Sequence, residues 1–580
     1  MDKKEVAAIL QEIAVLLELK GENPFKSRAY ENAARVISGL TKDIHELVET
    51  GEIRNIKGIG ERIADKITEL VKTGRLKYYE DLKASIPPGL VEMTAIPGLG
   101  PKKIKKMYEI LDIKNIAELE YACKENRLVD LEGFGERTQE KILQGIEFVK
   151  KHRERHLYHQ AEAAALPLYE AVSRHHKIIR ASIAGSLRRK KETIKDIDIV
   201  ASAEDRDREE IMDFYVKLPD VEIITAKGLT KSSVVLKSGI NADLRIVTDE
   251  QFPYALHHFT GSAEHNTAMR SLAKKMGMKM SEYGLFKNET ELIPCKDEVE
   301  IFAAFGLDYI PPELREDNGE IEAAAEHRIP KLVELNEIKG ILHCHSNFSD
   351  GANSIEEMAL ATREMGYQYL GICDHSQSVY YAKGLSPDRV KEQHEIIDEL
   401  NSRFSDFKIF KGTECDILGD GSLDYPEDVL ASFDFVVISV HSRLNMSEEE
   451  ANERIIKAMR HPYVTILGHP TGRLLLGRDG YPVNMYKIID VAAELGVVIE
   501  LNASPHRLDI DWRYCKYAKD KGVLISINPD AHSVDGLNDI KYGVGIARKG
   551  WLEKPNILNT LSLQEIEQFF KQRKSKFQSN

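Results

Sequence analysis

The chain has 580 residues, of which 42% are hydrophobic and 30% are charged, and its formal net charge is -14. This length exceeds what one hydrophobic core can organise and predicts three to five domains, while the composition excludes fibrous and disordered classes. The charge argues against nucleic-acid binding by the chain as a whole. Most of the excess acid lies in residues 321–580, however, so local contacts with nucleic acid in the first half stay open.

The six cysteines show neither CxxC spacing nor a disulfide framework, which predicts reduced thiols. The first residues, MDKKEV, are not typical of a signal peptide, and no apolar run reaches the length of a membrane span. We therefore expect a cytoplasmic protein with no membrane partner.

Residues 1–50 are predicted to be helical. Apolar side chains recur there at helical spacing on one face in each of two segments, with Val6, Ile9, Leu10, Ile13, Leu16 and Leu17 in the first and Ala29, Ala33, Val36 and Ile37 in the second.

A short glycine element then occurs three times, at intervals of 35 to 40 residues, and each copy is predicted to open a helix. The paired glycines are Gly58 and Gly60, Gly98 and Gly100, and Gly133 and Gly135. Glycine permits a left-handed turn, and the free N–H groups of a helix N-terminus attract anions, so such hairpins can hold a DNA backbone without reading its sequence. Four lysines (102, 103, 105 and 106) follow the second copy. The third copy, between Glu132 and Glu136, is the best candidate for a purely structural turn.

Residues 155–320 are predicted to be mixed α/β and to contain an acidic site. Asp196 and Asp198 alternate with isoleucines, so a strand would place both carboxylates on one face. Neighbouring acids repel each other unless a cation lies between them. Asp243 lies in a second strand-like run, and three carboxylates on adjacent strands suit two-metal phosphoryl transfer. For the first pair alone, an edge strand with a solvated acidic face is the alternative.

A nucleotide-binding element is predicted just before the acidic pair. Gly185 and Ser186 supply a tight turn and a hydroxyl where a triphosphate could lie, and Arg188 and Arg189 supply positive charge. Further along, the segment His258-Phe259-Thr260-Gly261-Ser262 precedes Asn266 and Arg270 on a predicted helix.

These motifs resemble those of the family X DNA polymerases of the polymerase beta type, over residues 1–315. The resemblance implies gap filling in DNA repair, with gapped or primer-template DNA and deoxynucleoside triphosphates as substrates. Asp196 and Asp198 would bridge two Mg²⁺ or Mn²⁺ ions, and Asp243 would bind only the ion that activates the primer 3'-hydroxyl. The implied nucleotide contacts are Gly185, Ser186 and Arg189 at the triphosphate, Phe259 and Gly261 at the sugar, and Asn266 and Arg270 at the base-pair edge.

Two residues depart from the family pattern. His258 stands where eukaryotic members carry a tyrosine against the sugar, which puts the exclusion of ribonucleotides in doubt. Asn241 replaces an arginine next to Asp243, so the electrostatics on the primer side can differ.

Lys66, one turn after Arg62, matches the Schiff-base lysine of the polymerase beta lyase domain, and the segment from Phe25 and Lys26 to Tyr30 matches its 5'-phosphate pocket. Cationic neighbours lower the pKa of a lysine and make its amine a nucleophile, so removal of a 5'-deoxyribose phosphate is chemically plausible. A solvated or phosphate-binding lysine is the alternative. We also expect a monovalent cation at the helix-hairpin-helix motifs.

After a predicted linker, the pattern changes to seven short apolar runs separated by helical segments, which predicts βα units and a parallel sheet. The runs are 341–345, 369–373, 407–412, 435–440, 464–468, 497–501 and 523–527. Six of them end in histidine or acid, and in a βα barrel the strand ends converge on one mouth. The candidate ligands are His343, His345, Asp350, His375, Glu414, His441, His469, Asp530 and His532.

The same nine residues resemble the ligand set of the polymerase and histidinol phosphatase (PHP) family. The resemblance implies a distorted (βα)7 barrel with three metal ions, two of them bridged by Glu414, and a 3'-5' exonuclease with possible incision of abasic sites. Mixed imidazole and carboxylate ligands suit Zn²⁺ or Mn²⁺. Arg473 and Arg507, in loops after two of the strands, are further candidates for contact with substrate phosphate.

The sequence thus predicts a multidomain α/β protein, a monomer associated with the bacterial nucleoid. The predicted units are a lyase-like helical domain (1–90), fingers with helix-hairpin-helix motifs (91–152), a nucleotidyltransferase palm with a mixed sheet (153–250), a thumb (251–315), a linker (316–337) and the PHP domain (338–575). Two alternatives stay open: the nucleotidyltransferase acts on RNA or a small molecule, or the PHP domain is only structural or a sensor of DNA ends.

Overall fold

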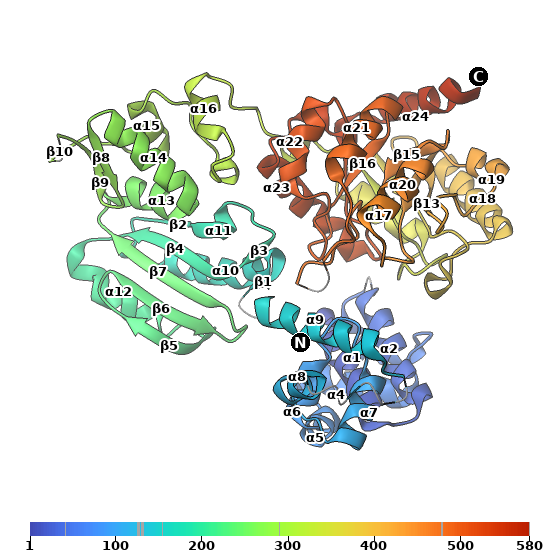
Figure 1. The fold of residues 1–580 in the computed structure, drawn as a ribbon. Helices are drawn as coiled ribbons and strands as arrows, with labels where there is room; N and C mark the ends of the chain where they lie inside the picture. Colours follow the sequence, from blue (N-terminus) through green and yellow to red (C-terminus); the bar gives the residue numbers. More distant parts are fainter. Residues whose placement is uncertain are drawn as a thin grey trace.

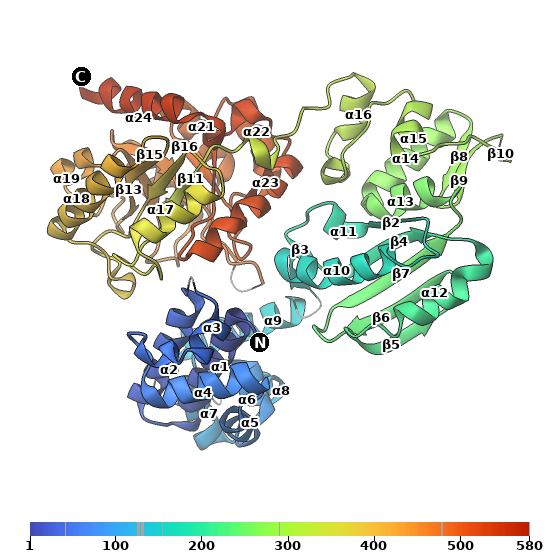
Figure 2. The same cartoon turned by 180° about the vertical axis from the view of Figure 1, so that it is seen from behind.

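The computed structural model describes residues 1–40, 42–124, 128, 131, 133–152, 155–288, 290–476 and 479–578. Glu132 and the predicted boundary at residue 153 lie outside the described residues. Figures 1 and 2 show three lobes: a helical lobe (blue to cyan), an α/β lobe (green) and a barrel lobe (yellow to red). The helical lobe lies beneath the barrel lobe in both views.

The helical lobe confirms the two N-terminal helices and the helix after each glycine element. Asp2 caps α1 through a capping box with Glu5, and Gly21 ends the helix in a left-handed conformation (φ 75°). The helices are α1 (Lys3–Lys20), α2 (Pro24–Ser38), α3 (Ile44–Glu49), α4 (Glu61–Thr73), α5 (Lys77–Ala84), α6 (Pro88–Met93), α7 (Pro101–Leu111), α8 (Ile116–Lys124) and α9 (Glu136–His152).

The α/β lobe contains the predicted mixed sheet. Its strand order is β2-β4-β7-β6-β5, with β4 and β7 parallel and the other pairs antiparallel. The strands are β2 (Arg180–Ile183), β4 (Asp196–Ser202), β5 (Val221–Lys227), β6 (Lys231–Leu236) and β7 (Asn241–Val247). A small β1 (His156–Leu157) and β3 (Thr193–Ile194) ladder, α10 (Tyr158–Ser173), α11 (Gly185–Arg188) and α12 (Arg208–Tyr215) complete this part.

A second part of the same lobe follows, and its polypeptide runs on into the predicted linker. It comprises α13 (Phe252–Thr260), α14 (Ala263–Lys275), β8 (Met278–Ser281), β9 (Gly284–Lys287), β10 (Glu291–Leu292), α15 (Glu298–Ala304) and α16 (Glu320–Ala325). The linker is charged in sequence, yet Glu320 is fully buried and bonds His265 on α14 at 2.6 Å. Part of the predicted linker is therefore packed against α14.

The barrel lobe is a seven-stranded sheet in which every neighbouring pair is parallel. A bridge between Cys344 and Ala531 brings the first strand to the end of the last, so the sheet nearly closes. The strands are β11 (Gly340–Cys344), β12 (Tyr369–Ile372), β13 (Lys408–Asp416), β14 (Phe435–Ser439), β15 (Val464–Leu467), β16 (Val498–Asn502) and β17 (Ile525–Asn528). All seven predicted runs contain a strand, and β13 continues past its predicted end, so that Glu414 lies inside it.

Helices cover the outside of this barrel (Figure 1). They are α17 (Ile355–Glu364), α18 (Pro387–Arg403), α19 (Glu427–Ser432), α20 (Glu448–Met459), α21 (Met485–Leu495), α22 (Trp512–Asp520), α23 (Ile540–Lys549) and α24 (Leu563–Gln578). Alternation of strand and helix along the chain gives the parallel order, because each helix returns the chain to the same edge. Over the described residues, no helix combines the length and apolar character needed to cross a bilayer.

The barrel lobe contacts both other lobes. Nζ of Lys3 lies 3.1 Å from a carboxylate oxygen of Asp535, and the side-chain amide of Asn353 donates to the carbonyl of Gly39 at 2.9 Å. Toward the α/β lobe, the rings of Tyr158 and Tyr542 meet edge to face with centroids 5.8 Å apart. The barrel lobe is therefore in contact with both of the other lobes of the chain.

Candidate active sites

The structure brings the three predicted aspartates of the α/β lobe together on adjacent strands. The parallel register of β4 and β7 places Asp198 directly beside Asp243, and Asp196 beside Asn241. Ile197 and Ile199, which alternate with the acids, are fully buried beneath them. Both faces of β4 are therefore used, one for the core and the other for a cluster of carboxylates.

Gly185 and Asp198 approach each other so closely that only glycine fits. A Cβ atom at position 185 would lie 2.3 Å from Oδ2 of Asp198, and the backbone there is left-handed (φ 63°). The turn that begins α11 therefore sits against the acidic cluster. Burial, followed by the charges of Asp196 and Asp243, raises the pKa of the Asp198 carboxyl to about 6. Nζ of Lys231 lies 2.7 Å from Oδ2 of Asp243 and supplies one counter-charge.

Two arginines connect α11 to the end of α13. Nη1 of Arg188 donates to the Thr260 hydroxyl at 2.6 Å, and Nη1 of Arg189 donates to the Thr260 carbonyl at 2.7 Å. Arg188 also pairs with Glu298 through both terminal nitrogens, at 3.1 and 2.6 Å. The two predicted nucleotide elements, at residues 185–189 and 258–262, are thereby joined into one unit.

The remaining predicted nucleotide contacts lie on or after α13. The Arg245 guanidinium lies 4.1 Å from the centroid of the Phe259 ring, so one face of that ring is occupied by a cation. The side-chain amide of Asn266 donates to the carbonyl of His258 at 2.7 Å and to that of Gly261 at 3.3 Å, which holds the end of α13 in place. Arg270 is an exposed residue on α14.

The glycine elements have the geometry of anion-binding hairpins. Gly58, Gly98 and Gly133 have φ values of 97°, 77° and 85°, which are readily accessible only to glycine. Gly60 and Gly100 occupy the N-cap positions of α4 and α7, where no side chain makes a capping hydrogen bond. The N–H groups at the start of α4 and the N–H of Lys102 in α7, which follows Pro101, are therefore available to a phosphate.

Lys66 on α4 lies in a small aromatic and basic cluster. Its Nζ lies 4.5 Å from the centroid of the Tyr78 ring, Lys26 reaches the same ring at 5.8 Å, and Tyr30 stacks on it with centroids 6.3 Å apart. Burial, followed by the charges of Lys26 and Arg62, lowers the pKa of Lys66. Tyr78 is a member of this cluster that could not be identified from the sequence. It stands on the next helix, and an aromatic residue on an amphipathic helix gives no local signal of function.

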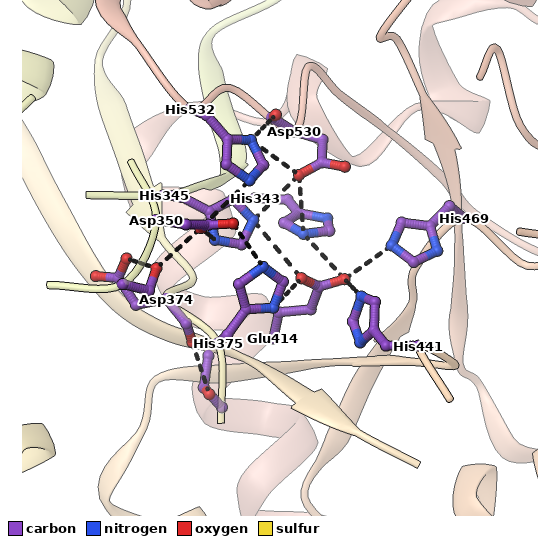
Figure 3. Close-up of polar contacts among 12 residues, drawn as sticks. His343, His345, Asp350, Asp374, His375, Glu414, His441, His469, Asp530 and His532 are labelled. Carbon is purple, nitrogen blue, oxygen red and sulfur yellow. Dashed lines mark hydrogen bonds and ion pairs between the residues drawn. The ribbon is translucent and has the colours of Figure 1, made fainter. Parts of the chain in front are cut away.

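Glu414 lies in the centre of the barrel mouth, surrounded by imidazoles (Figure 3). Its Oε1 lies 2.8 Å from Nε2 of His469, 3.2 Å from Nε2 of His441 and 3.5 Å from Nε2 of His343. Its Oε2 lies 3.0 Å from Nδ1 of His375. Burial alone would raise the pKa of Glu414, but the facing imidazoles hold it well below its usual value. The two carboxylate oxygens thus face different groups of ligands.

The nine predicted barrel ligands converge at this mouth although they come from six different strands and the loops after them. Within this set, three groups have ligand atoms within 4.8 Å of one another: His345, Asp350, His375 and His532; His343, His345 and Asp530; and His375, Glu414 and His441. Each of the three groups could hold one cation.

These side chains fit divalent metal ions by an independent criterion. Two donor atoms on a tetrahedral zinc ion, each about 2.1 Å from it, lie roughly 3.4 Å apart. The separations around Glu414 are of that size. Nε2 of His343 and Nδ1 of His345 are buried and make no hydrogen bond with the described residues, which is costly unless another partner is supplied.

Glu500 on β16 is a site residue that the sequence analysis missed. It is fully buried and accepts hydrogen bonds from Nδ1 of His343 at 2.5 Å and from the backbone N–H of His469 at 2.7 Å. The bond to Nδ1 turns Nε2 of His343 toward the ligand cluster, as carboxylates behind metal-bound histidines do. His343 also adopts a left-handed backbone (φ 54°) at a register shift in β11, which marks local strain at the site.

We expect Glu500→Gln to weaken metal binding in the barrel by about 10- to 100-fold, because the charged partner of His343 is lost. Titration of the metal-free protein with Mn²⁺, followed by counting of bound ions, measures the change. Glu494→Gln, on the exposed part of α21, is the matched control. Unchanged affinity in the Glu500 variant would show that this carboxylate does not support the cluster.

The two loop arginines have different surroundings. The Arg473 side chain is mostly buried, donates to the Arg507 carbonyl at 2.9 Å and pairs with Asp511 at 2.8 Å, so it holds the loops together. Arg507 reaches toward the cluster, with Nε 3.8 Å from Oδ2 of Asp530. Only Arg507 therefore lies against a predicted ligand.

Comparison with known protein families finds matches to four parts of the chain. Family models match for a helix-hairpin-helix domain at residues 1–76, a SAM-like helix-hairpin-helix tandem at 90–147, a DNA polymerase beta thumb at 255–316 and a PHP domain at 342–504. The polymerase and PHP domains imply the use of divalent metal ions, in agreement with the ligand clusters.

Related proteins match the whole chain or its last part. A protein of Bacillus subtilis (strain 168) named DNA polymerase/3'-5' exonuclease PolX is 42% identical over 574 residues, which cover 98% of this chain and 100% of the relative. A probable phosphatase of Thermoanaerobacter sp. (strain X514) is 28% identical over 245 residues, 40% of this chain and 95% of the relative. The chain therefore belongs to the family X DNA polymerases that carry a C-terminal PHP domain.

Proposed function

We propose that this protein is a DNA polymerase that fills short gaps during DNA repair and removes nucleotides from 3' ends with its PHP domain. The main support for this proposal is that one chain contains two separate ligand clusters. One consists of three carboxylates, and the other of imidazoles and carboxylates. The relative that matches along the whole chain is named for both activities.

In the α/β lobe, Asp196, Asp198 and Asp243 would hold two divalent ions. When bound, such ions polarise phosphate oxygens and help to deprotonate an attacking hydroxyl. A purely carboxylate site favours Mg²⁺ or Mn²⁺. Ser186 and Arg189, on the turn pressed against Asp198, would bind the triphosphate of the incoming nucleotide, and the hairpins at Gly58, Gly98 and Gly133 would hold the DNA backbone.

In the barrel, the nine clustered ligands would hold three ions, which are Zn²⁺ or Mn²⁺ by the mixture of nitrogen and oxygen donors. When bound, the ions supply a hydroxide nucleophile and stabilise charge on the phosphate that is attacked. Glu414 would bridge two of them, because its two oxygens face different imidazoles. Arg507 would contact the substrate phosphate. Cleavage at abasic sites is a second reaction open to the same chemistry.

The direct test uses one gapped duplex labelled at the primer 5' end. With deoxynucleoside triphosphates and Mg²⁺ we expect extension to the end of the gap, and with Mn²⁺ alone we expect shortening from the 3' end. A small-molecule or RNA acceptor should be used far less well than the gapped duplex. Transfer to those acceptors at an equal rate would contradict the assignment to DNA.

Lys66 is proposed as the nucleophile of a 5'-deoxyribose-phosphate lyase, supported by its lowered pKa and by Lys26 across the Tyr78 ring. The protein should be trapped on 5'-deoxyribose-phosphate DNA by borohydride, and Lys66→Ala should reduce trapping by about tenfold or more. Lys72→Ala, an exposed lysine on the same helix, is the control. Equal trapping in both variants would assign another amine.

The assembly and location follow from the same proposal. Both ligand clusters are complete within one chain, so a monomer suffices for both reactions. A repair polymerase of a bacterium would act on chromosomal DNA, at the nucleoid. A monovalent cation at the hairpin carbonyls would strengthen their contact with a phosphate.

A further inference from the structure

A buried lysine of the barrel lobe reaches the proposed nucleotide site of the α/β lobe. Lys549 is the last residue of α23, and it is fully buried. Its Nζ donates to the carbonyl of Arg189 at 3.2 Å and pairs with Oε1 of Glu316 at 2.5 Å. The ring of Trp512 lies beneath it, with the centroid 4.7 Å away. This lysine therefore contacts polypeptide far from it in sequence.

Oε1 of Glu316 is shared between two cations, and one of them is the arginine proposed to bind the triphosphate; a third cation, Lys191, lies 3.9 Å from the other carboxylate oxygen. Nε of Arg189 lies 2.9 Å from the same Oε1 that pairs with Lys549. The side chains of Arg189 and Glu316 are both more than nine-tenths buried. Burial would raise the pKa of Glu316, but the charges of Lys549 and Arg189 hold it below its usual value. The carboxylate stays ionised between them.

From this geometry we propose that Lys549 is a positioning residue for nucleotide binding, supplied by the PHP half to the polymerase half. Its hydrogen bond fixes the Arg189 backbone at the end of the Gly185–Arg188 turn. Its charge balances Glu316, so that Glu316 orients Arg189 without competing fully with a phosphate. The contacts to Glu316 and Thr260 use Nε and Nη1 of Arg189, so Nη2 is the guanidinium nitrogen that we assign to the phosphate contact.

The inference rests on the proposed role of Arg189, and it predicts a specific kinetic effect. In Lys549→Met the Trp512 ring keeps an apolar partner. Glu316 then has Arg189 at 2.9 Å and the more distant Lys191 at 3.9 Å as its cations, so it binds Arg189 more strongly. The KM for deoxynucleoside triphosphates in gap filling should rise about tenfold, with kcat changed much less, because uniform binding is lost. Digestion from the 3' end should keep its wild-type rate.

A second substitution separates positioning from simple loosening of the interface. Glu316→Gln removes the charge that competes for Arg189, so the double variant Lys549→Met/Glu316→Gln should recover most of the lost nucleotide affinity. Glu316→Gln alone should have a KM at or below the wild-type value. If Lys549→Met does not fold, the KM values of the double variant and of Glu316→Gln still test the proposed role of Lys549.

Arg548→Met is the matched control, because Arg548 is the neighbouring residue on α23 and pairs across the same interface with Glu313 at 2.7 Å without touching Arg189. Its KM should stay within about twofold of wild type. The inference is overturned if Lys549→Met has a wild-type KM, if Arg548→Met raises KM equally, or if Glu316→Gln fails to restore it. A wild-type protein that does not extend a primer would instead overturn the proposed function.

Discussion

Asp198→Asn is expected to abolish primer extension, with a loss on the order of 1,000-fold or more in the rate of nucleotide addition. Asp198 lies beside Asp243 across β4 and β7 and against the Gly185 turn, so it is the carboxylate that touches both the acidic cluster and the nucleotide element. Asparagine keeps the shape and removes the charge that would hold the ions. Extension of a gapped primer under single-turnover conditions measures the loss.

The same substitution makes a prediction about stability that is independent of catalysis. Because the folded-state pKa of Asp198 is raised to about 6, the folded protein binds more protons than the unfolded chain between about pH 4 and 6. The stability of the metal-free protein should therefore fall as pH rises through this window. Asp198→Asn should melt at a higher temperature than wild type at pH 8 and should lose the stabilisation by Mg²⁺.

Two controls make the result specific. Digestion from the 3' end in Mn²⁺ should be unchanged in Asp198→Asn, because the barrel ligands belong to a different cluster. Asp205→Asn, in an exposed turn of the same lobe, should extend primers at the wild-type rate. Normal extension by the Asp198 variant would show that the three aspartates are not the polymerase site.

The strands that carry both clusters could be predicted because their local patterns are strong. Ile197 and Ile199 alternate with acids on a half-buried strand, and runs such as 435–438 are continuously apolar, as is typical of parallel strands covered on both faces. The convergence of the barrel ligands followed from topology alone, since the ends of parallel strands meet at one edge.

The missed residues are those whose role depends on a partner far away in the chain. Glu500 stands within a buried apolar strand, and an acid in such a strand is the only signal that it could have given. Lys549 and Glu316 are separated by 233 positions, and the second lies where the sequence predicts a linker. Neither residue has a local pattern, because ion pairs between domains are created by packing and not by periodicity.

Glu414→Gln is expected to abolish 3' digestion and to leave primer extension intact. Both oxygens of the carboxylate lie against imidazoles, with His469 Nε2 at 2.8 Å from one and His375 Nδ1 at 3.0 Å from the other. An amide has only one oxygen, and its NH₂ group would face imidazole nitrogens or cations. At least one ion should therefore be lost, and several kcal/mol of charge stabilisation with it, which corresponds to a decrease on the order of 1,000-fold.

Metal counting together with the nuclease assay decides between a catalytic and a structural barrel site. Fewer bound Mn²⁺ or Zn²⁺ ions, loss of digestion and a nearly normal melting temperature would indicate a catalytic centre. A large decrease in melting temperature, with no 3' digestion even in the wild type, would indicate that the ions serve folding. Glu427→Gln, on exposed α19 outside the mouth, is the control for both measurements. Glu414 is held ionised by the imidazoles around it, and its charge contributes to the raised pKa values of His343, His375 and His441. The Gln variant removes that charge, so the pKa values of these three histidines should fall toward the ordinary range even when no metal is bound.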